Sequence, residues 1–370
     1  MKIEQFKMER MQSTWENVVD INLSESGVHP LTLDGFISPA DLADIRRLEL
    51  GYSQTNGTAG LRQEIARIYP GLSSEQLLVT AGSSESNFLL SWSLIEPGDE
   101  VLFELPNYMQ MWGLHRAFGA KVKPFWLRES LDWQPDPDEL KKLITKKTKL
   151  IVLTNPNNPT GAILSEESVK AIISLADKAG AWILADEVYQ GAERDGRTTP
   201  SFWGRYPKVM AVNGLSKAYG LPGLRIGWIV GPADLVLKTW PYHDYTTISP
   251  SVLSDRLAQL ALRPENREKI LARTRGILNK NFPVIEAWLK GHGGLFSFRP
   301  PRAGAIVFVR YNLKVNSTAL VERLIHDRSV LIVPGDHFEM DHHLRFGFGS
   351  EGGYLMEGLK RIDQTLGEVR

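Results

Sequence analysis

The sequence predicts an α/β protein in which a large domain is built on a mainly parallel β-sheet and a smaller α+β domain follows it. Two observations lead to this prediction. Between residues 76 and 230, short apolar runs alternate with helical patterns, as expected for strands and helices of a parallel sheet that is covered on both faces. After Pro250, long helices precede short strands, which indicates a second and smaller domain.

The composition of the chain narrows the class of protein. Its 370 residues are enough for two domains. It has 43 basic and 43 acidic side chains, so nothing suggests nucleic acid or a membrane as a partner. Cysteine is absent, which excludes disulfides and thiolate metal ligands, and we expect no metal site. Residues 1–10 lack the apolar core of a secretion signal, and no apolar run is long enough to cross a bilayer, so we expect a soluble, cytoplasmic protein.

Residues 1–38 are predicted to form an N-terminal arm that belongs with the small domain and covers the site. A short helix is expected around residues 14–19, and a segment rich in turn-forming residues follows at 22–30. Four side chains in the arm have functional potential: Thr14, Glu16, Glu25 and His29. A capped helix followed by a solvated loop would use the same residues, so both interpretations stay open here.

The elements of the large domain, residues 39–250, follow in order. A helix begins at Pro39 and another covers residues 61–69, with Tyr52 in the loop between them. Strands are predicted at 76–80, 100–104, 149–154, 182–185, 209–212 and 226–230, and helices at 87–94, 137–145 and 166–179. The small domain, residues 251–370, is expected to contain helices at 251–261, 265–290 and 354–366 and strands at 305–309, 330–333 and 344–348, and to join the arm in space.

Polar residues follow the carboxyl end of nearly every predicted strand. They are Gly82, Ser83, Ser84, Tyr108, Asn158, Asp186, Tyr189 and Lys217. In parallel sheets ligands bind at that edge, so their joint placement predicts one site. One of these residues alone is weaker evidence for a site, because Ser83 or Ser84 could simply cap the following helix.

Lys217 and Arg225 indicate the chemistry of this site. Lys217 lies among small residues after an apolar run, and Arg225 follows eight positions later. A lysine whose pKa is lowered by desolvation or by a nearby cation is a nucleophile that forms Schiff bases, and a guanidinium binds phosphate through two hydrogen bonds. A buried loop with a snorkelling lysine and a surface arginine would also fit these residues taken alone.

Taken together, the residues describe a site for pyridoxal phosphate. Lys217 would form the Schiff base, and Asp186 would keep the pyridine nitrogen protonated. Tyr189 and Asn158 would bind the ring oxygen, and Tyr108 would stack on the ring. Arg345 would bind a substrate carboxylate, also contacted by Asn158. The phosphate would be held by Gly82, Ser83, Ser84, Ser216 and Arg225.

These motifs, in this order, resemble the class I/II aminotransferase family of fold type I pyridoxal-phosphate enzymes. The resemblance is carried by Tyr52 with Gly57 and residues 61–62, and by residues 80–84, 106–108, 155–161, 186–189, 216–217, 225–227 and Arg345. It implies a sheet of the seven-stranded type and a homodimer in which Tyr52 reaches the phosphate of the partner. Gly214 is a departure, because the family usually has a serine there that touches the phosphate.

A narrower resemblance bears on the substrate. Residues 26–29, 214–225 and 243–247 are similar to the branch that contains capreomycidine synthase and the oxygen-using arginine oxidases and hydroxylases. It implies an arginine-type substrate and an arm whose Thr14 and His29 take part in catalysis. A buried guanidinium needs a carboxylate partner, and Glu16 and Asp244 are the candidates, although both could instead be solvated or cap helices.

We therefore expect an enzyme that acts at Cα of a free L-amino acid, with Lys217 moving the Cα proton. The first hypothesis is oxidative deamination or hydroxylation of an arginine-type substrate with O2. The alternatives are transamination to a 2-oxo acid, and a cyclase or lyase reaction of the capreomycidine synthase type. A non-catalytic regulator is disfavoured because Lys217, Asp186 and Arg225 are all present.

Overall fold

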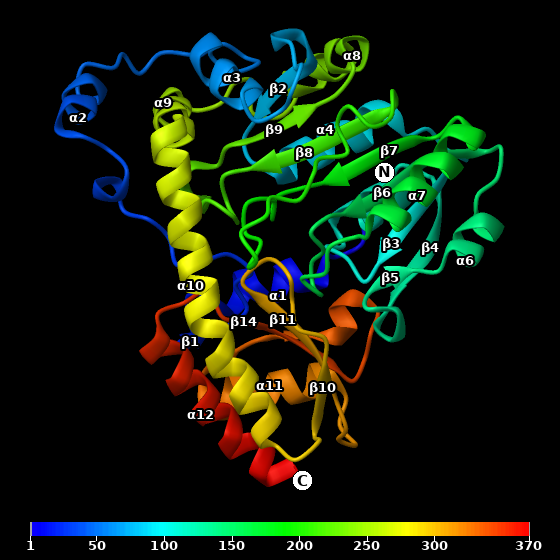
Figure 1. Cartoon of the computed structure of the whole chain (residues 1–370), viewed down its shortest axis with the longest axis vertical. Helices are drawn as coiled ribbons and strands as arrows, with labels where there is room; N and C mark the ends of the chain where they lie inside the picture. Colours follow the sequence, from blue (N-terminus) through cyan, green and yellow to red (C-terminus); the bar gives the residue numbers. More distant parts are fainter. Residues whose placement is uncertain (1, 370) are drawn as a thin grey trace.

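The structure, a computed structural model, describes residues 2–369 and contains one large sheet (Figure 1). Within these residues the sheet has eight strands in the order β2-β9-β8-β7-β6-β3-β4-β5. They are β2 (Leu77–Thr80), β3 (Glu100–Leu105), β4 (Lys121–Arg128), β5 (Gln134–Pro135), β6 (Thr148–Thr154), β7 (Trp182–Asp186), β8 (Val209–Gly214) and β9 (Gly227–Val230). All pairs from β8 to β4 are parallel, whereas β9 is antiparallel to β8 and β2, and β5 is antiparallel to β4. The predicted mainly parallel sheet is confirmed, with two-residue β5 as an added edge strand.

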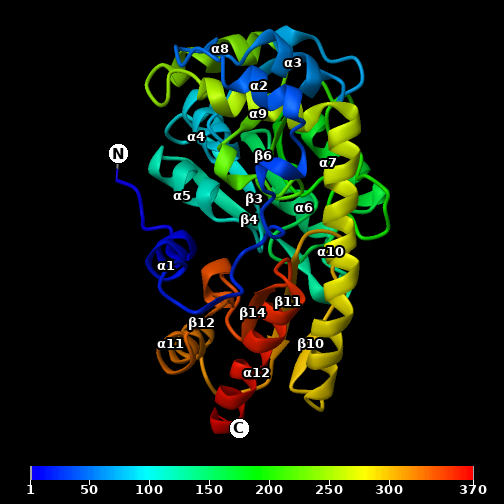
Figure 2. The ribbon, with the colours of Figure 1, turned by 90° about the vertical axis from the view of Figure 1, so that its left-hand side faces the viewer.

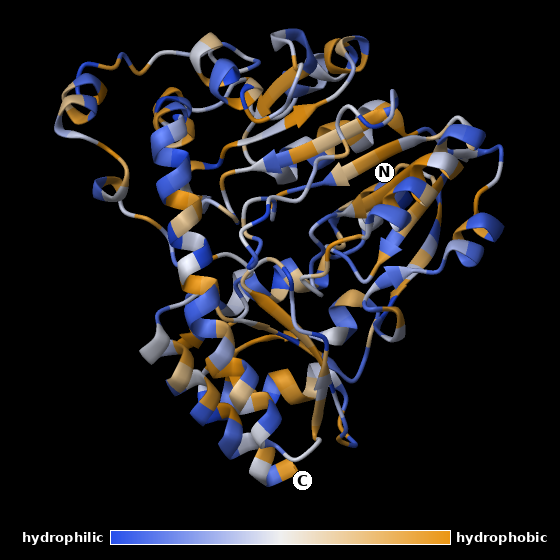
Figure 3. Ribbon diagram, viewed as in Figure 1, coloured by the Kyte–Doolittle hydropathy of each residue, from blue (hydrophilic) through white to orange (hydrophobic). Residues whose placement is uncertain are grey.

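Helices cover both faces of this sheet because its strands are apolar on both sides (Figure 3). Leu150 and Val152 of β6 share a core with α4 (Ser83–Leu94), α5 (Gln110–Ala117) and α8 (Ala233–His243). Ile151 and Leu153 point the other way, toward α6 (Pro137–Leu143) and α7 (Glu166–Ala179). On that second face, Val79 of β2 packs with α3 (Ala59–Ala66) and α9 (Val252–Leu262).

The C-terminal part contains an antiparallel sheet in the order β10-β11-β14-β13. Its strands are β10 (Phe296–Phe298), β11 (Ile306–Tyr311), β13 (Val333–Pro334) and β14 (His343–Gly347), and its helices are α11 (Ser317–Arg328) and α12 (Gly352–Val369). The long helix α10 (Pro264–Gly291) runs from the large sheet to this part in both ribbon views (Figure 2). The arm joins the same part, because β1 (Ile21–Asn22) pairs in parallel with β12 (Val330–Leu331).

The first helix differs from the prediction. It is α1 (Lys7–Trp15), whereas residues 16–20 form turns and a bend instead of the expected helix around 14–19. Val18 N and Val19 N both donate to Trp15 O, so the helix closes there, and β-branched valines favour its end. The next helix, α2 (Pro39–Ile45), begins with a capping box formed by Ser38 and Asp41.

Short 3-10 helices complete the chain: η1 (Leu33–Gly35), η2 (Ser74–Gln76), η3 (Glu129–Leu131), η4 (Pro222–Leu224) and η5 (Gly335–Phe338). The division into domains at residues 38 and 250 stays a prediction. One apolar core contains Leu61 of α3, Leu257 of α9 and Leu344 of β14, and so links the two sheets. Among residues 2–369, no helix has the length and apolar composition that a membrane crossing requires.

Candidate active site

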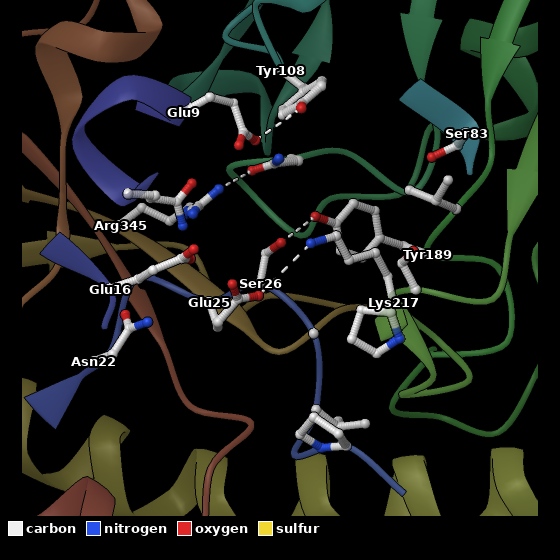
Figure 4. A pocket seen from close by; sticks show the side chains of 18 of the residues that line it. Glu9, Glu16, Asn22, Glu25, Ser26, Ser83, Tyr108, Tyr189, Lys217 and Arg345 are labelled. Carbon is white, nitrogen blue, oxygen red and sulfur yellow. Dashed lines mark hydrogen bonds and ion pairs between the residues drawn. The ribbon is translucent and has the colours of Figure 1, made fainter. Parts of the chain in front are cut away.

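A cavity of about 790 Å³ lies at the carboxyl edge of the large sheet, where the arm and β14 meet it (Figure 4). The structure brings together most of the side chains that the strand ends predicted, because the carboxyl ends of β2, β3, β6, β7 and β8 share this edge. The predicted residues that line the cavity are Ser83, Ser84, Tyr108, Asn158, Asp186, Tyr189, Ser216, Lys217, Arg225 and Arg345, with Glu16 and His29 from the arm.

Lys217 projects into the cavity from the loop after β8, with 30% of its side chain exposed. Its Nζ lies 3.9 Å from Glu25 Oε2. Burial lowers the pKa of Lys217, but Glu25 and Tyr189 raise it, and the net pKa lies above the ordinary value. The expected lowering is therefore not found, because the arm brings a carboxylate close to the amine. Lys217 is nevertheless the amine at this site that can form a Schiff base and move a proton.

Asp186 ends β7 as a buried carboxylate. Asn87 Nδ2 donates to its Oδ2 at 3.3 Å, and Val188 N donates to its Oδ1 at 3.2 Å. Burial raises the pKa of Asp186 to about 6, although both hydrogen bonds and the charge of Lys217 oppose this. Such a carboxyl gains from a cationic N–H partner, because pairing offsets the cost of its desolvation.

The turn after β2 is shaped to admit an anion. Gly82 has a φ of +90°, and a Cβ there would lie 2.4 Å from Arg225 Nη2. A Cβ on Gly227 would lie 2.3 Å from Ser83 N. Both glycines therefore let Arg225 and the start of α4 approach closely. The hydroxyls of Ser83, Ser84 and Ser216, the Arg225 guanidinium and the helix N-terminus form a donor set suited to a phosphate.

Close packing explains why position 214 is a glycine where the family usually has a serine. It ends β8 opposite Gly227, and a Cβ on Gly214 would lie 2.9 Å from the carbonyl oxygen of Ile226. A serine would thus require the backbone of β9 to move away.

Arg345, Asn158 and Tyr189 form the opposite wall, and each is at most 4% exposed. Arg345 Nη1 donates to Asn158 Oδ1 at 2.8 Å, and Tyr189 Oη donates to Ser26 Oγ at 2.8 Å. Because Asn158 uses its oxygen on Arg345, its amide N–H groups are left to donate toward the cavity.

Tyr108 is held between the arm and the sheet. Its hydroxyl donates to Glu9 Oε1 at 2.8 Å, and its ring makes an edge contact with Phe6 at 4.9 Å between centroids. Glu9 was not predicted as a site residue. It lies on α1, which sequence periodicity placed too late in the chain, so nothing in its neighbourhood pointed to the site.

Three carboxylates of the arm, Glu9, Glu16 and Glu25, line the cavity on the side away from Ser83 (Figure 4). Burial raises the pKa of Glu16, and Glu25 and Glu9 raise it further, against the opposing charge of Lys217. These acids therefore repel one another, and a cation placed among them would relieve the repulsion.

Four predicted residues are not among those that line this cavity: Gly82, which lies in the turn just before Ser83, and Thr14, Asp244 and Tyr52. Thr14 is exposed, and its hydroxyl donates to Arg10 O within α1 at 2.7 Å, so the geometry gives no support to a catalytic role. Asp244 is an exposed residue at the end of α8. Tyr52 is 89% exposed and contributes nothing to the cavity of its own chain.

The sequence profile of the family described as aminotransferase class I and II matches residues 30–362, a range that contains the cavity-lining residues except those of the arm before Pro30. The chain belongs to this family. It is 32% identical to capreomycidine synthase of Streptomyces vinaceus over 351 residues, which covers 94% of this chain and 90% of that protein. It is 28% identical to an arginine–pyruvate transaminase of Pseudomonas aeruginosa over 331 residues, or 86% and 83% of the two chains.

The fold agrees with this family. A PLP-dependent aminotransferase from Streptococcus suis superposes with a TM-score of 0.94 at 33% identity, covering 100% of this chain and 99% of the other. The protein is accordingly an enzyme of the pyridoxal-phosphate-dependent class I/II aminotransferase family, with the predicted α/β fold type I.

The residues present fit pyridoxal phosphate. The glycine-lined turn with Arg225 matches a phosphate, buried Asp186 matches a protonated ring nitrogen, and Lys217 matches the aldehyde. When bound, the cofactor supplies an electron-withdrawing ring that stabilises negative charge at the substrate Cα. The chain's own groups do the rest: Lys217 can take and return the Cα proton, and Arg345 can orient a carboxylate.

Proposed function

We propose that this enzyme acts at Cα of a free amino acid with a cationic side chain, with L-arginine as the best candidate. The observation that carries the proposal is the acidic arm, Glu9, Glu16 and Glu25, at the cavity. In the proposed site Arg225 faces the phosphate, Asp186 faces the ring nitrogen and Arg345 faces the substrate carboxylate. Lys217 and Arg345 are both close enough to act on the charges of the arm carboxylates. Once Arg345 pairs with the substrate carboxylate, a guanidinium side chain would supply further positive charge to balance them.

For the outcome of the reaction, the first candidate is oxidation with O2. Oxidative deamination would convert the amino acid, O2 and water into a 2-oxo acid, ammonia and hydrogen peroxide. His29, which lines the cavity from the arm, supports this candidate as a group able to move a proton near Lys217. The arm also provides Glu9 and Ser26, which tie it to Tyr108 and Tyr189 across the cavity.

Two other outcomes are favoured by the relatives. Similarity to the arginine–pyruvate transaminase favours transfer of the amino group to a 2-oxo acid. Similarity to capreomycidine synthase favours a cyclase or lyase reaction. All three outcomes use the same Lys217, Asp186 and Arg345.

We further propose a homodimer in which Tyr52 completes the phosphate site of the partner. Its 89% exposure fits a side chain that acts outside its own chain. Trp240 of α8 donates to Thr55 Oγ1 at 3.0 Å, which connects the Tyr52 loop to the helix that exposed Asp244 directly follows. Asp244 would then meet the guanidinium only in the cavity of the partner.

The test is to mix holoenzyme with L-arginine, without any 2-oxo acid, and to follow O2 uptake and ammonia release together. Multiple turnovers with matched O2 and ammonia would support the oxidase. Turnover only after pyruvate or 2-oxoglutarate is added would support the transaminase instead. No reaction of arginine under either condition, alongside turnover of an apolar amino acid, would contradict the proposal. Lys217→Ala serves as the control without turnover.

A further inference from the structure

Glu85 occupies an unexpected position for a carboxylate. It follows Ser84 in the first turn of α4, close to where the proposed phosphate would bind. The positive end of a helix favours an anion, but two anions at one helix end repel each other. Glu85 is not among the residues that line the cavity, and its side chain is 7% exposed. Its charge is therefore directed away from the phosphate site.

Four donors surround this carboxylate. Ala81 N donates to Oε2 at 2.5 Å, so the side chain folds back onto the backbone of the turn that it follows. The hydroxyls of Thr246 and Thr247 donate to Oε1 at 2.5 and 2.8 Å. His243 Nε2 lies 3.4 Å from Oε2. Burial raises the pKa of Glu85, but the bonds from His243, Thr246 and Ala81 outweigh it and bring the pKa to about 2.

His243 connects the carboxylate to a second segment. It is the last residue of α8, its side chain is fully buried, and its Nε2 is 2.9 Å from Thr247 Oγ1. The backbone of this segment is bent back, since Thr246 N and Ile248 N both donate to His243 O. Asp244 lies within this bend. The same buried group thus fixes both the turn at 81–84 and the segment that displays Asp244.

We propose that Glu85 and His243 are positioning residues that hold the phosphate-binding turn and the segment 243–248 in one arrangement, so that cofactor affinity depends on the pair. The inference rests on the proposed assignment of residues 82–84 to the phosphate and does not depend on the identity of the substrate. The direction of the change in cofactor affinity distinguishes positioning by Glu85 from a purely electrostatic effect of its charge. Removing the charge of Glu85 would strengthen binding of the phosphate if repulsion dominated, whereas loss of positioning weakens it.

The experiment is a titration of cofactor-free enzyme with pyridoxal phosphate, followed by absorbance and by the circular dichroism of the bound cofactor. We expect Glu85→Gln and His243→Ala each to raise Kd about tenfold or more, as for loss of a hydrogen bond to a charged group. His243→Gln, which keeps an N–H donor, should recover much of the affinity. In the double variant Glu85→Gln with His243→Ala, the increases should not multiply, because the residues act as a unit.

Glu100→Gln is the matched control. Glu100 also accepts from a cation and a threonine, Lys123 at 2.9 Å and Thr145 at 2.8 Å, but it begins β3 at the opposite edge of the sheet. It should leave Kd unchanged, and thermal melts of the cofactor-free variants will show whether each one folds. Unchanged or tighter binding in folded Glu85→Gln overturns the inference. Ser83→Ala tests the phosphate assignment itself: if it leaves Kd unchanged, that assignment fails separately.

Discussion

Arg345 Nη1 and Asn158 Oδ1 are joined by a 2.8 Å hydrogen bond between the two sheets. Arg345 Nη2 donates to Ser24 O of the arm at 2.5 Å, and the side chain is 1% exposed. Burial lowers the pKa of Arg345, although Tyr189, Glu25 and Glu9 oppose this. The guanidinium is thus fixed from both sides before any substrate arrives, and Nε has no hydrogen-bond partner among residues 2–369.

Replacing this arginine by lysine tests its role toward the carboxylate. Arg345→Lys keeps the charge but loses the planar fork that orients a carboxylate. We expect KM for the amino acid to rise about 10- to 100-fold, the effect of one hydrogen bond to a charged group, with a smaller change in kcat. Steady-state kinetics measure both. A KM equal to that of the wild type would show that the carboxylate binds elsewhere.

Glu16 is expected to select for side-chain charge. Glu16→Gln should lower kcat/KM for L-arginine about tenfold or more while changing that for L-citrulline, a neutral isostere, little. The control is Glu4→Gln, because Glu4 is also an arm carboxylate but pairs with Arg116 at 3.0 Å outside the cavity. Equal losses with both substrates would remove Glu16 from the side-chain site.

Gly82→Ala probes the anion-binding turn. The substitution would put a methyl group against the Arg225 guanidinium and would strain a φ of +90°. We expect weaker binding of pyridoxal phosphate, with Kd raised about tenfold or more. Gly98→Ala is the control, since Gly98 has a φ of +93° but nothing within 4 Å of the added Cβ. If both variants bind the cofactor as the wild type does, the turn is not its phosphate site.

Glu104 predicts a pH dependence of stability. Its Oε1 accepts from Thr154 N and Asn157 Nδ2, but burial dominates and raises its pKa from 4.5 to about 8. Between these values the folded state holds a proton that the unfolded state has lost. This group therefore reduces stability as pH rises from about 5 to 8, by about 1.4 kcal/mol per pH unit.

Glu104→Gln should flatten this dependence. Denaturant unfolding of the cofactor-free enzyme at several pH values measures the slope. Asp186 and Glu187, whose pKa values burial also raises, to about 6 and about 7, would retain their share of it. An unchanged slope in Glu104→Gln would mean that Glu104 is ionised in the folded protein.

Most strands of the large sheet could be predicted from the sequence, because apolar runs that alternate with helical patterns are compatible with few other folds. The prediction missed β4 and α5. Lys121 and Lys123 interrupt the apolar pattern of β4, and Gly113 interrupts that of α5, so these elements depend on tertiary packing more than on their local sequence. Site residues at strand ends were predictable, since topology gathers them at one edge. Glu9 was not, because its position depends on where α1 ends and on the pairing of β1 with β12, far along the chain.

The most direct test of the central claim is the ratio of kcat/KM for L-arginine to that for L-citrulline in the wild-type enzyme, measured with O2 and with pyruvate as co-substrate. The two amino acids have nearly the same shape and differ in side-chain charge. An acidic cavity wall formed by Glu9, Glu16 and Glu25 predicts a ratio of about ten or more with whichever co-substrate supports turnover. A ratio near one, or a preference for citrulline, would contradict a site built for a cationic side chain.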